Sequence, residues 1–363
     1  MTIFGTRPEI IRLSLIMKVL DAHSEHITVH TGQNYDESLS DIFIRDLAVR
    51  TPDINLAIKA KNFGDQVGQI LSKTDEVLEM HRPDKVVILG DTNSGLSAIL
   101  CARRGIPVFH LEAGNRCFDD RVPEEVNRRI IDHSSAVLLP YTNRSKENLV
   151  SEGIEAERIF VTGNPIREVL NTFDPHIEKS TIMTDLNVQK GQFFLVTLHR
   201  AENVDIESRL RSIFTGLAEI AVRWDKTVLV SVHPRTREKL TGFGLEVDEG
   251  RLRLLEPLGF FDFVSLEKNA FAVLTDSGTV QEECSIFGVP NITVRDVTER
   301  PETLESGSNV ISGADTEAIV RAVTLAIDQG NDWAPPPEYL IGNVSRAVSK
   351  IVLGYSSFRR HVS

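Results

Sequence analysis

The stretch Ala272-Val-Leu-Thr-Asp-Ser-Gly-Thr-Val-Gln-Glu-Glu283 places an apolar strand directly before a Ser-Gly step and a helix that carries two carboxylates. The start of a helix offers N–H groups without intrahelical partners and a partial positive charge, and Gly278 lets the backbone approach an anion closely. We therefore expect Ser277 and Gly278 to bind phosphate. Glu283 lies about a turn and a half further along the helix, where its two oxygens can accept both hydroxyls of a ribose. The stretch predicts a nucleotide-diphosphate site.

Apolar runs followed by polar clusters recur along the whole chain. The runs alternate with longer amphipathic stretches, and nearly all of them end in a polar cluster instead of a hairpin turn. This rhythm is typical of βαβ units, so the sequence predicts an α/β fold with two doubly wound parallel sheets, whose ligands gather at the carboxyl ends of the strands. The expected strands are Thr2–Phe4, Ile27–His30, Lys85–Leu89, Val108–Leu111, Val137–Leu139, Ile159–Val161, Phe193–Thr197, Thr227–Val232, Arg251–Leu255, Phe271–Thr275 and Asn291–Val294.

A chain of 363 residues is too long for one ordinary core and fits two domains with a cleft between them. Gly and Pro punctuate it near 163–165 and 335–337. We expect an N-terminal Rossmann-like domain at residues 1–164 and a nucleotide-binding Rossmann-like domain at residues 165–343. A last helix, roughly Val344–Arg359 within 344–363, is expected to pack back on the first domain.

The composition excludes several classes of protein. The net charge of −12 argues against nucleic-acid binding, and no apolar run approaches the roughly 20 residues of a membrane span. Cys101, Cys117 and Cys284 are too few and too scattered for a disulfide framework or a Cys-based zinc site. Residue 1 leads directly into an apolar strand, so we expect a cytoplasmic protein. There is also no Walker A motif and no GxGxxG fingerprint.

Two arginines follow the first expected strand. In Gly5-Thr-Arg-Pro-Glu9, Pro8 suits the first turn of a helix and Arg7 lies at the strand end, with Arg12 five residues further on. Together they can clamp a diphosphate through bidentate hydrogen bonds, although a solvated, salt-bridged helix face explains them about equally well.

Carboxylates follow three further elements of the first domain. Asp91 comes after the strand at 85–89, Glu112 ends the strand at 108–111, and Glu124 and Glu125 open the helix after Pro123. Taken singly, each has a structural explanation as a helix cap or a partner of the helix dipole. Because they converge at one edge of the sheet, we expect Asp91, Glu112 and either Glu124 or Glu125 to provide acid and base catalysis.

The second domain adds histidines and an arginine. His199 and His233 each follow a strand, where a histidine is either functional or simply packed or solvated, and His199 is the stronger candidate for a functional role. Arg300 is expected near Ser277 and Gly278. His26 and its neighbour His30 lack a third ligand, so we expect no metal site.

Three phenylalanines stand together at the start of a helix after Pro257. Phe260, Phe261 and Phe263 are more often core residues than a platform for a base, but one ring can stack on a nucleobase.

The combination of these clusters, nearly end to end along the chain, resembles the non-hydrolysing UDP-N-acetylglucosamine 2-epimerases. That family has a two-domain, glycosyltransferase-B-like fold and interconverts UDP-sugars at C2 without added metal or nicotinamide, so the resemblance implies no cofactor. The motifs are Gly5-Thr-Arg-Pro-Glu9, Gly90-Asp-Thr92, His110-Leu-Glu-Ala-Gly114, Pro123-Glu-Glu125, His199-Arg200, Asp276-Ser-Gly278, Gln281-Glu-Glu283 and Thr298-Glu-Arg-Pro-Glu302.

The resemblance also implies roles for individual residues. It assigns catalysis to three carboxylates and a position beside the pyrophosphate or sugar to His199, with phosphate binding by four residues, the ribose bound by Glu283 and the uracil by Phe263. Arg12 stands where the family commonly has lysine, and Thr279 replaces a usual glycine. The carboxylates are Asp91, Glu112 and Glu124, and the phosphate-binding residues are Arg7, Ser277, Gly278 and Arg300.

Two segments, 114–119 and 232–237, resemble the branch that converts UDP-2-acetamido-2,6-dideoxy-L-talose to UDP-N-acetyl-L-fucosamine for surface polysaccharide. That reaction is our main expectation, and UDP-N-acetylglucosamine to UDP-N-acetylmannosamine is the alternative. A UDP-sugar glycosyltransferase, a hydrolysing epimerase and a non-catalytic UDP-sugar sensor are the rivals. We further expect a homodimer, and the resemblance permits a second UDP-sugar as allosteric activator.

Overall fold

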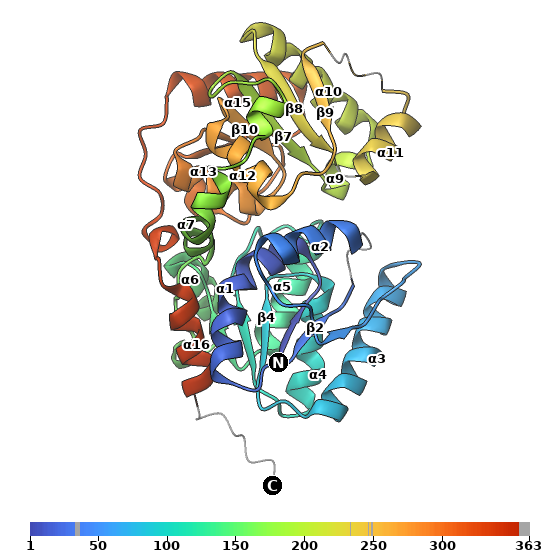
Figure 1. Cartoon of the computed structure of the whole chain (residues 1–363), viewed down its shortest axis with the longest axis vertical. Coiled ribbons are helices and arrows are strands. Elements are labelled where there is room, and N and C mark those ends of the chain that lie inside the picture. Colours follow the sequence, from blue (N-terminus) through green and yellow to red (C-terminus); the bar gives the residue numbers. More distant parts are fainter. Residues whose placement is uncertain (33–36, 233, 246, 248–249, 356–363) are drawn as a thin grey trace. The chain divides into compact units, whose positions relative to one another are not determined.

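The computed structural model describes residues 1–355 except 33–36, 233, 246 and 248–249. It divides into two compact units (Figure 1). Unit 1 comprises Met1–Thr172 and the C-terminal segment that begins at Pro337, and unit 2 comprises Phe173–Pro336. Within the described residues, no helix has the length and apolar character needed to cross a membrane.

Unit 1 is built on a parallel sheet in the order β3-β2-β1-β4-β5-β6. Its strands are β1 (Thr2–Phe4), β2 (Thr28–His30), β3 (Ile54–Asn55), β4 (Val86–Leu89), β5 (Val108–Leu111) and β6 (Val137–Leu139). Its helices are α1 (Arg7–His23), α2 (Glu37–Asp46), α3 (Phe63–His81), α4 (Ala98–Arg103), α5 (Pro123–Ser134), α6 (Asn143–Ser151) and α16 (Val344–Gly354), with short 3-10 helices η1 (Asn93–Ser97), η2 (Ala156–Arg158) and η3 (Pro337–Leu340).

Unit 2 repeats this architecture with a parallel sheet in the order β12-β11-β10-β7-β8-β9. Its strands are β7 (Phe193–Leu198), β8 (Thr227–Val232), β9 (Leu252–Leu255), β10 (Ala272–Thr275), β11 (Asn291–Thr293) and β12 (Asn309–Ile311). Its helices are α8 (Ile182–Asp185), α9 (Ala201–Val204), α10 (Glu207–Arg223), α11 (Pro234–Gly242), α12 (Phe260–Asn269), α13 (Gly278–Phe287), α14 (Pro301–Glu305) and α15 (Thr316–Asp328); α7 (Ile166–Ile177) crosses the division between the units.

Alternate residues of the central strands of unit 2 belong to different apolar clusters of the core. In β7, Phe194 and Val196 belong to one buried apolar cluster, whereas Phe193 and Leu195 belong to another. A strand that is apolar on both faces needs a layer of helices on each side, which is the arrangement of parallel sheets. The predicted α/β fold with two doubly wound sheets is therefore confirmed.

The order of strands reverses at one point in each sheet. In unit 1 the reversal lies between β1 and β4, and in unit 2 it lies between β7 and β10. Ligands of doubly wound sheets bind at the carboxyl ends of the strands that flank such a point. The segments that follow these four strands are therefore the candidate ligand-binding positions of the two units.

Most expected strands are present, with differences at the sheet edges. Ile159–Val161 is not a strand, because only Ile159 makes an isolated bridge, to Leu138. Conversely, the sequence analysis missed β3 and β12, which are short edge strands. Both carry asparagine, which is depleted in strands.

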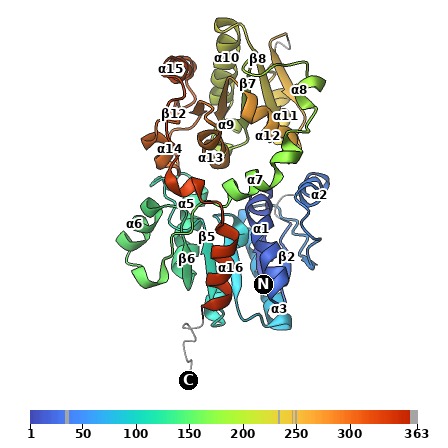
Figure 2. The same ribbon diagram turned by 60° about the vertical axis from the view of Figure 1, so that its left-hand side comes forward.

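The C-terminal helix belongs to unit 1, where α16 lies beside α1 (Figure 1, Figure 2). Lys85 donates to the carbonyl of Val352 at 2.6 Å, and the Glu168 carboxylate accepts from the N–H and hydroxyl of Ser345. The sequence analysis divided the chain after Asn164 and before Val344, whereas the units divide within α7 and after Pro336.

Candidate active site

At the reversal point of unit 1, Glu9 links the segments that follow β1 and β4. Its buried carboxylate accepts from the N–H of Gly5 at 3.0 Å and from the hydroxyls of Thr6 at 2.7 Å and Thr92 at 3.2 Å. Burial raises the pKa of Glu9 to about 7, although these hydrogen bonds oppose the rise. The carboxylate thus holds the loop of Arg7 against the loop of Asp91.

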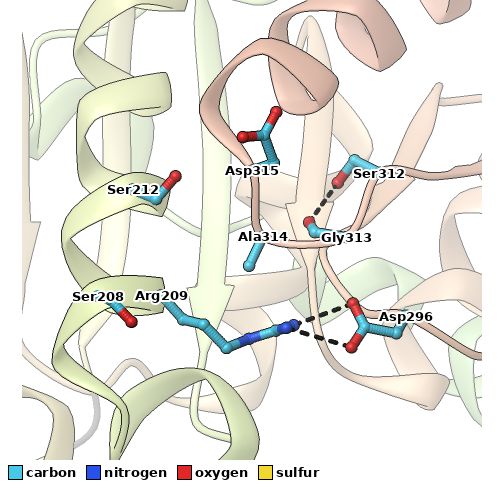
Figure 3. A pocket seen from close by; sticks show the side chains of 8 residues that line it. All are labelled: Ser208, Arg209, Ser212, Asp296, Ser312, Gly313, Ala314 and Asp315. Atoms are coloured by element: carbon cyan, nitrogen blue, oxygen red, sulfur yellow. Dashed lines mark hydrogen bonds and ion pairs between the residues drawn. The ribbon is translucent and has the colours of Figure 1, made fainter.

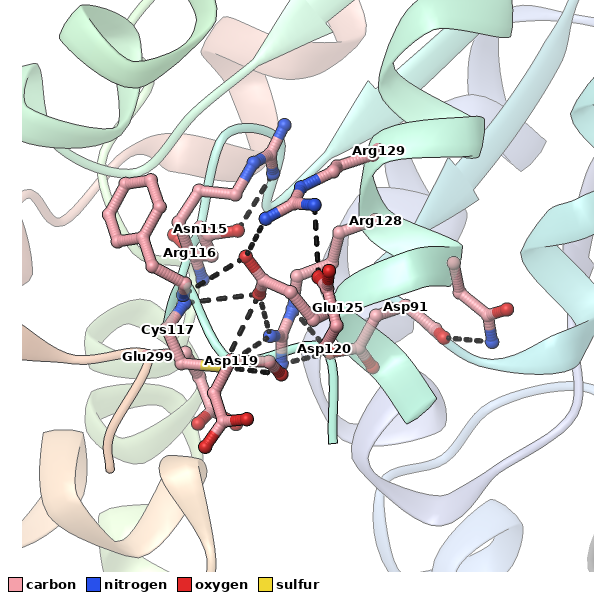
Figure 4. A network of polar contacts seen from close by, with 12 residues as sticks. Asp91, Asn115, Arg116, Cys117, Asp119, Asp120, Glu125, Arg128, Arg129 and Glu299 are labelled. Atoms are coloured by element: carbon pink, nitrogen blue, oxygen red, sulfur yellow. Dashed lines mark hydrogen bonds and ion pairs between the residues drawn. The ribbon is translucent and has the colours of Figure 1, made fainter. Parts of the chain in front are cut away.

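Asp91 lies directly after β4 and is held by Arg128 of α5 (Figure 4). The guanidinium contacts one Asp91 oxygen through Nη2 at 2.6 Å and Nε at 2.9 Å, and its Nη1 donates to Glu125 at 2.9 Å. Arg128 is nearly buried, whereas 21% of the Asp91 side chain is exposed. The ion pair fixes the position of the Asp91 carboxylate, part of which still reaches solvent.

Glu124 and Glu125 have different surroundings in the structure. Glu125 is fully buried and accepts from the N–H groups of Cys117 at 3.0 Å and Phe118 at 3.1 Å as well as from Arg128 (Figure 4). Burial raises the pKa of Glu125, but the Cys117 N–H and the Arg128 charge outweigh burial and hold the pKa below its usual value. Glu124 is only half-buried. Of the two, Glu124 is therefore the one placed to meet a ligand.

Glu112 follows β5 with a backbone φ of 64°, a left-handed conformation that is uncommon outside glycine and is often found at functional sites. Its carboxylate is buried, lies 3.6 Å from Nη1 of Arg12 and is 3.4 Å from the amide nitrogen of Asn115. Arg12 is itself buried in α1. Arg12 thus orients Glu112, in addition to the phosphate role expected from the sequence.

A buried polar cluster supports this segment from behind. His110 contacts the carbonyl of Gly90 through Nε2 at 2.9 Å and Asp132 through Nδ1 at 2.8 Å. Arg116 contacts Asp132 at 2.8 Å and forms a bidentate ion pair with Glu152. Burial raises the pKa of Asp132, but His110 and Arg116 outweigh it and hold the pKa below its usual value. The cluster joins the end of β4 to the end of β5.

At the reversal point of unit 2, Asp276 after β10 orients His199 after β7. Asp276 is fully buried, contacts Nδ1 of His199 at 3.0 Å and accepts from the N–H groups of His199 and Arg200. Burial raises the pKa of Asp276, but the His199 charge and these hydrogen bonds hold it below its usual value. Since 47% of the His199 side chain is exposed, its other edge faces outward.

The start of α13 is the position at which the sequence predicts an anion site in unit 2. Ser277 precedes the first turn, its hydroxyl lies 3.0 Å from that of Thr279, and a side chain at Gly278 would come within 3.4 Å of the Arg300 guanidinium. Arg300 is buried and pairs with Glu282 through Nε. The structure therefore brings Ser277, Gly278, Thr279 and Arg300 together.

Glu283 lies further along the same helix and is nearly buried. The aromatic residues at the start of α12 differ in their surroundings. Phe260 is buried, Phe261 stacks on His176, and the half-buried Phe263 packs partly against the core. Phe263 is thus the ring of the three that neither core burial nor an aromatic stack fully occupies.

The remaining candidates from the sequence are Arg7, His26 and His233. Arg7 is half-buried, with its guanidinium 5.7 Å from the centre of the Phe43 ring. His26 bonds Asp21 and Thr2. His233 lies outside the described residues.

A separate pocket of about 420 Å³ lies in unit 2 (Figure 3). Its main polar feature is the bidentate ion pair of Arg209 with Asp296, at 3.1 Å for each contact. None of the site residues expected from the sequence lines it, so it is not the candidate active site. Its lining residues are Ser208, Arg209, Ser212, Asp296, Ser312, Gly313, Ala314 and Asp315.

Three supporting residues were missed by sequence reasoning: Glu9, Arg128 and Asp276. Each lies in or beside a motif that the sequence analysis quoted, but none of the three was given a role of its own. The signal that could have found Asp276 is its position directly after a central strand, beside His199 across the sheet.

The chain is similar over most of its length to a known protein family and to several of its members. The family model described as UDP-N-acetylglucosamine 2-epimerase matches residues 18–353. The chain belongs to this family. It is 42% identical to a UDP-N-acetylglucosamine 2-epimerase of Methanocaldococcus jannaschii over 342 residues, which cover 92% of this chain and 93% of that protein. It is 36% identical to a UDP-2,3-diacetamido-2,3-dideoxy-D-glucuronate 2-epimerase of Pseudomonas aeruginosa, with coverage of 90% and 92%.

The solved structures agree. The M. jannaschii UDP-GlcNAc 2-epimerase in complex with UDP-GlcNAc and UDP has a TM-score of 0.93 and 40% identity, with 98% of this chain and 99% of that chain covered. The glycosyltransferase WaaG shares the fold at 12% identity with a TM-score of 0.57, covering 98% of this chain and 100% of that chain, which supports the glycosyltransferase-B-like architecture.

The family resemblance expected from the sequence is confirmed, and so is the enzyme class, an isomerase that acts on UDP-sugars. The more specific expectation of the 6-deoxy-L-talose substrate receives no support from these names. They favour UDP-N-acetylglucosamine, which was the alternative.

Proposed function

We propose that the protein interconverts UDP-N-acetylglucosamine and UDP-N-acetylmannosamine by inverting C2 of the sugar. The observation that carries this proposal is the likeness, over 98% of the chain, to a 2-epimerase whose structure holds UDP-GlcNAc and UDP. The polar clusters at the two sheet reversals supply a second, independent argument, because they contain both an anion site and several carboxylates.

Unit 2 binds the UDP moiety in this proposal. Ser277, Gly278 and Thr279 offer the N-terminus of α13 to a phosphate, and Arg300 adds a positive charge beside Gly278. Glu283 accepts the ribose hydroxyls.

The base and the remaining phosphate are assigned to two further residues. Phe263 stacks on the uracil. Arg7, at the first position of α1 in unit 1, contributes a further phosphate contact.

The carboxylates of unit 1 act on the sugar. The C2 proton of a UDP-amino sugar is not adjacent to a carbonyl group, so its removal needs a leaving group. A carboxylate accepts the C2 proton, the C–H electrons form the C1–C2 double bond, and UDP leaves with the electrons of the C1–O bond. A second carboxyl group then returns a proton to the opposite face of C2 while a UDP oxygen re-forms the bond to C1.

Proton transfer on both faces of C2 needs at least two acid or base groups, which explains why unit 1 carries Asp91, Glu112 and Glu124. Arg128 orients Asp91 and Arg12 orients Glu112, so both carboxylates are positioned to exchange a proton with the sugar. Glu124 is half-buried and completes the set.

His199 stabilises the departing UDP. Its Nδ1 contacts the buried Asp276, which fixes the orientation of the ring, and its exposed edge can donate a hydrogen bond to a diphosphate. Replacement of the imidazole by His199→Asn is expected to lower turnover, since UDP develops its extra negative charge as the C1–O bond breaks.

A substrate panel tests the proposal. The purified protein is incubated separately with UDP-GlcNAc, with UDP-2-acetamido-2,6-dideoxy-L-talose and with UDP-2,3-diacetamido-2,3-dideoxy-D-glucuronate, and products are identified by chromatography. We expect the highest kcat/KM with UDP-GlcNAc and UDP-ManNAc as its product. A higher value for the talose restores our main expectation from the sequence, and a higher value for the glucuronate favours the function named for the P. aeruginosa relative.

Two properties of the assembly complete the proposal: a homodimer, which is the commonest state of soluble oligomers, and activation by a second UDP-sugar. Light scattering tests the first. A sigmoidal dependence of the initial rate on UDP-GlcNAc concentration tests the second, and a hyperbolic dependence contradicts it.

A further inference from the structure

Helices α12 and α13 bring two buried carboxyl groups of unit 2 into hydrogen-bonding contact. Glu267 lies in the last turn of α12 with 0% of the residue exposed, and its side chain bonds that of Glu283, which is 4% exposed. The thiol of Cys284 lies 3.3 Å from Oε1 of Glu267. Within the described residues, no cationic side chain pairs with Glu267.

Two carboxyl groups in contact and away from water cannot both be ionised. Burial, and then the charge of Glu283, raise the pKa of Glu267 well above its usual value. The other titratable group of α13 that faces the pair, Cys284, also has its thiol pKa raised well above the usual value by burial and by Glu267. From β11, Asn291 contributes a neutral amide that donates to the Cys284 sulfur at 3.8 Å.

The position of the shared proton follows from the surroundings. Oε2 of Glu267 has no hydrogen-bond partner in the described part of the chain, so no donor at this oxygen stabilises a negative charge on the Glu267 carboxyl group. Glu267 also lies at the C-terminal end of α12, where the helix dipole disfavours a negative charge. The proton therefore resides on Glu267, and Glu283 is the ionised partner.

We propose that Glu267 is a positioning residue for nucleotide recognition: it donates its proton to Glu283 and so holds Glu283 as an oriented, ionised acceptor for the 2′ and 3′ hydroxyls of a ribonucleoside diphosphate. This inference rests on the proposed binding of UDP by unit 2. It adds a residue outside the site itself that sets the preference for ribose over 2′-deoxyribose.

The arrangement makes sugar discrimination depend on pH. When the pair loses its shared proton at alkaline pH, two negative charges face each other, and the hydrogen bond by which Glu267 orients Glu283 is lost. Glutamine at position 267 supplies an N–H donor that does not titrate. Methionine at this position has a similar volume but no donor.

The test measures dissociation constants of UDP and 2′-deoxy-UDP by calorimetry between pH 6 and pH 10 for the wild type, Glu267→Gln and Glu267→Met. The ratio of the two constants cancels titration of the diphosphate, which both ligands share. We expect a ratio that falls about tenfold at alkaline pH in the wild type, the equivalent of one charged hydrogen bond. The ratio should stay high at every pH in Glu267→Gln and low at every pH in Glu267→Met.

Cys284→Ala serves as the matched control, because it removes the neighbouring thiol and keeps both carboxyl groups; it should follow the wild-type profile. Infrared spectroscopy at pH 8, where Glu9 is ionised, gives a readout that does not need a ligand: a protonated carboxylic acid band should be present in the wild type and lost in Glu267→Gln. Absence of that band, or a wild-type ratio in Glu267→Met, overturns the inference alone. Equal affinities of the wild type for both ligands overturn the ribose role of Glu283 as well, and absence of UDP binding overturns the proposed function.

Discussion

Adjacent residues of this chain have different tasks, and their hydrogen bonds show which is which. Glu124 and Glu125 both lie in the first turn of α5. Glu125 accepts hydrogen bonds from two backbone N–H groups and from Arg128, whereas Glu124 is half-buried. A buried carboxylate with so many donors stabilises a loop and is poorly placed to exchange a proton.

A pair of matched substitutions tests this division. Glu124→Gln should lower kcat by roughly a hundredfold or more, as loss of a general acid or base does, and should leave UDP affinity and the melting temperature close to wild type. Glu125→Gln should cost roughly 3 kcal/mol of unfolding free energy, because it leaves the buried Arg128 without one of its charged partners. Steady-state kinetics and thermal denaturation measure both. The reverse pattern would exchange the roles of the two residues.

The same residues show what sequence reasoning can reach. The position of Asp91, Glu112 and Glu124 at strand ends or helix starts is readable from apolar runs that stop at polar residues. The choice between Glu124 and Glu125 is not, because both fall in one helical turn and only the path of the 115–122 loop decides which is covered. Pairings between distant segments, such as Asp276 with His199, depend on strand order.

At the scale of elements, single contacts join neighbouring strands of the unit 1 sheet. Glu9 connects the segments after β1 and β4, and Gly114 lets the segment after β5 approach α6.

Strand positions were largely predictable, since a buried parallel strand is a short, nearly continuous apolar run. The edge strands β3 and β12 were not, because they are short and carry asparagine.

Glu9 should make the stability of unit 1 depend on pH. Its pKa is raised by burial from 4.5 to about 7, so the folded state binds a proton that the unfolded state has released between these values. Stability from this group is complete below pH 4.5 and is lost as pH rises through 7, by about 3 kcal/mol. Denaturant titrations of wild type and Glu9→Gln at pH 5 and pH 8 measure it. Identical pH dependence in both proteins would contradict the prediction.

Glycine is required at 114 by the packing of α6. Gly114 has a φ of 79°, and a Cβ atom there would lie 2.2 Å from the carbonyl oxygen of Ser145. Gly105 has a similar φ of 71°, but a Cβ atom at position 105 would have no neighbouring atom within 4 Å. Gly105→Ala should therefore cost about 1 kcal/mol from the backbone alone, and Gly114→Ala several times more. Equal losses in melting temperature would show that α6 moves away at little cost.

At the scale of the whole molecule, the two units differ in how the chain builds them. Unit 2 is one continuous segment whose apolar clusters lie on both faces of its own sheet. Unit 1 needs the C-terminal segment, because α16 packs on α1 and buries Val344, Val348 and Val352. The two-domain organisation and the return of the last helix were expected from the sequence, but the division between Thr172 and Phe173 was not, although Pro175 lies close to it inside α7.

This difference predicts how fragments behave. Residues 173–336 alone should unfold cooperatively and bind UDP, whereas residues 1–172 alone should be poorly folded until a peptide of residues 337–363 is added. Circular dichroism and calorimetry on the fragments check both statements. A stable fragment of residues 1–172 that ignores the peptide would mean that α16 contributes little to unit 1.

The central claim is that the carboxylates of unit 1 exchange the proton at C2 of a UDP-amino sugar. The most direct measurement is a proton NMR time course of the purified protein with UDP-GlcNAc in deuterated water. The predicted result is loss of the H2 signal together with new UDP-ManNAc peaks, in which C2 carries deuterium. A UDP-GlcNAc signal that keeps its H2 intensity, while calorimetry shows that the nucleotide sugar is bound, would contradict the claim.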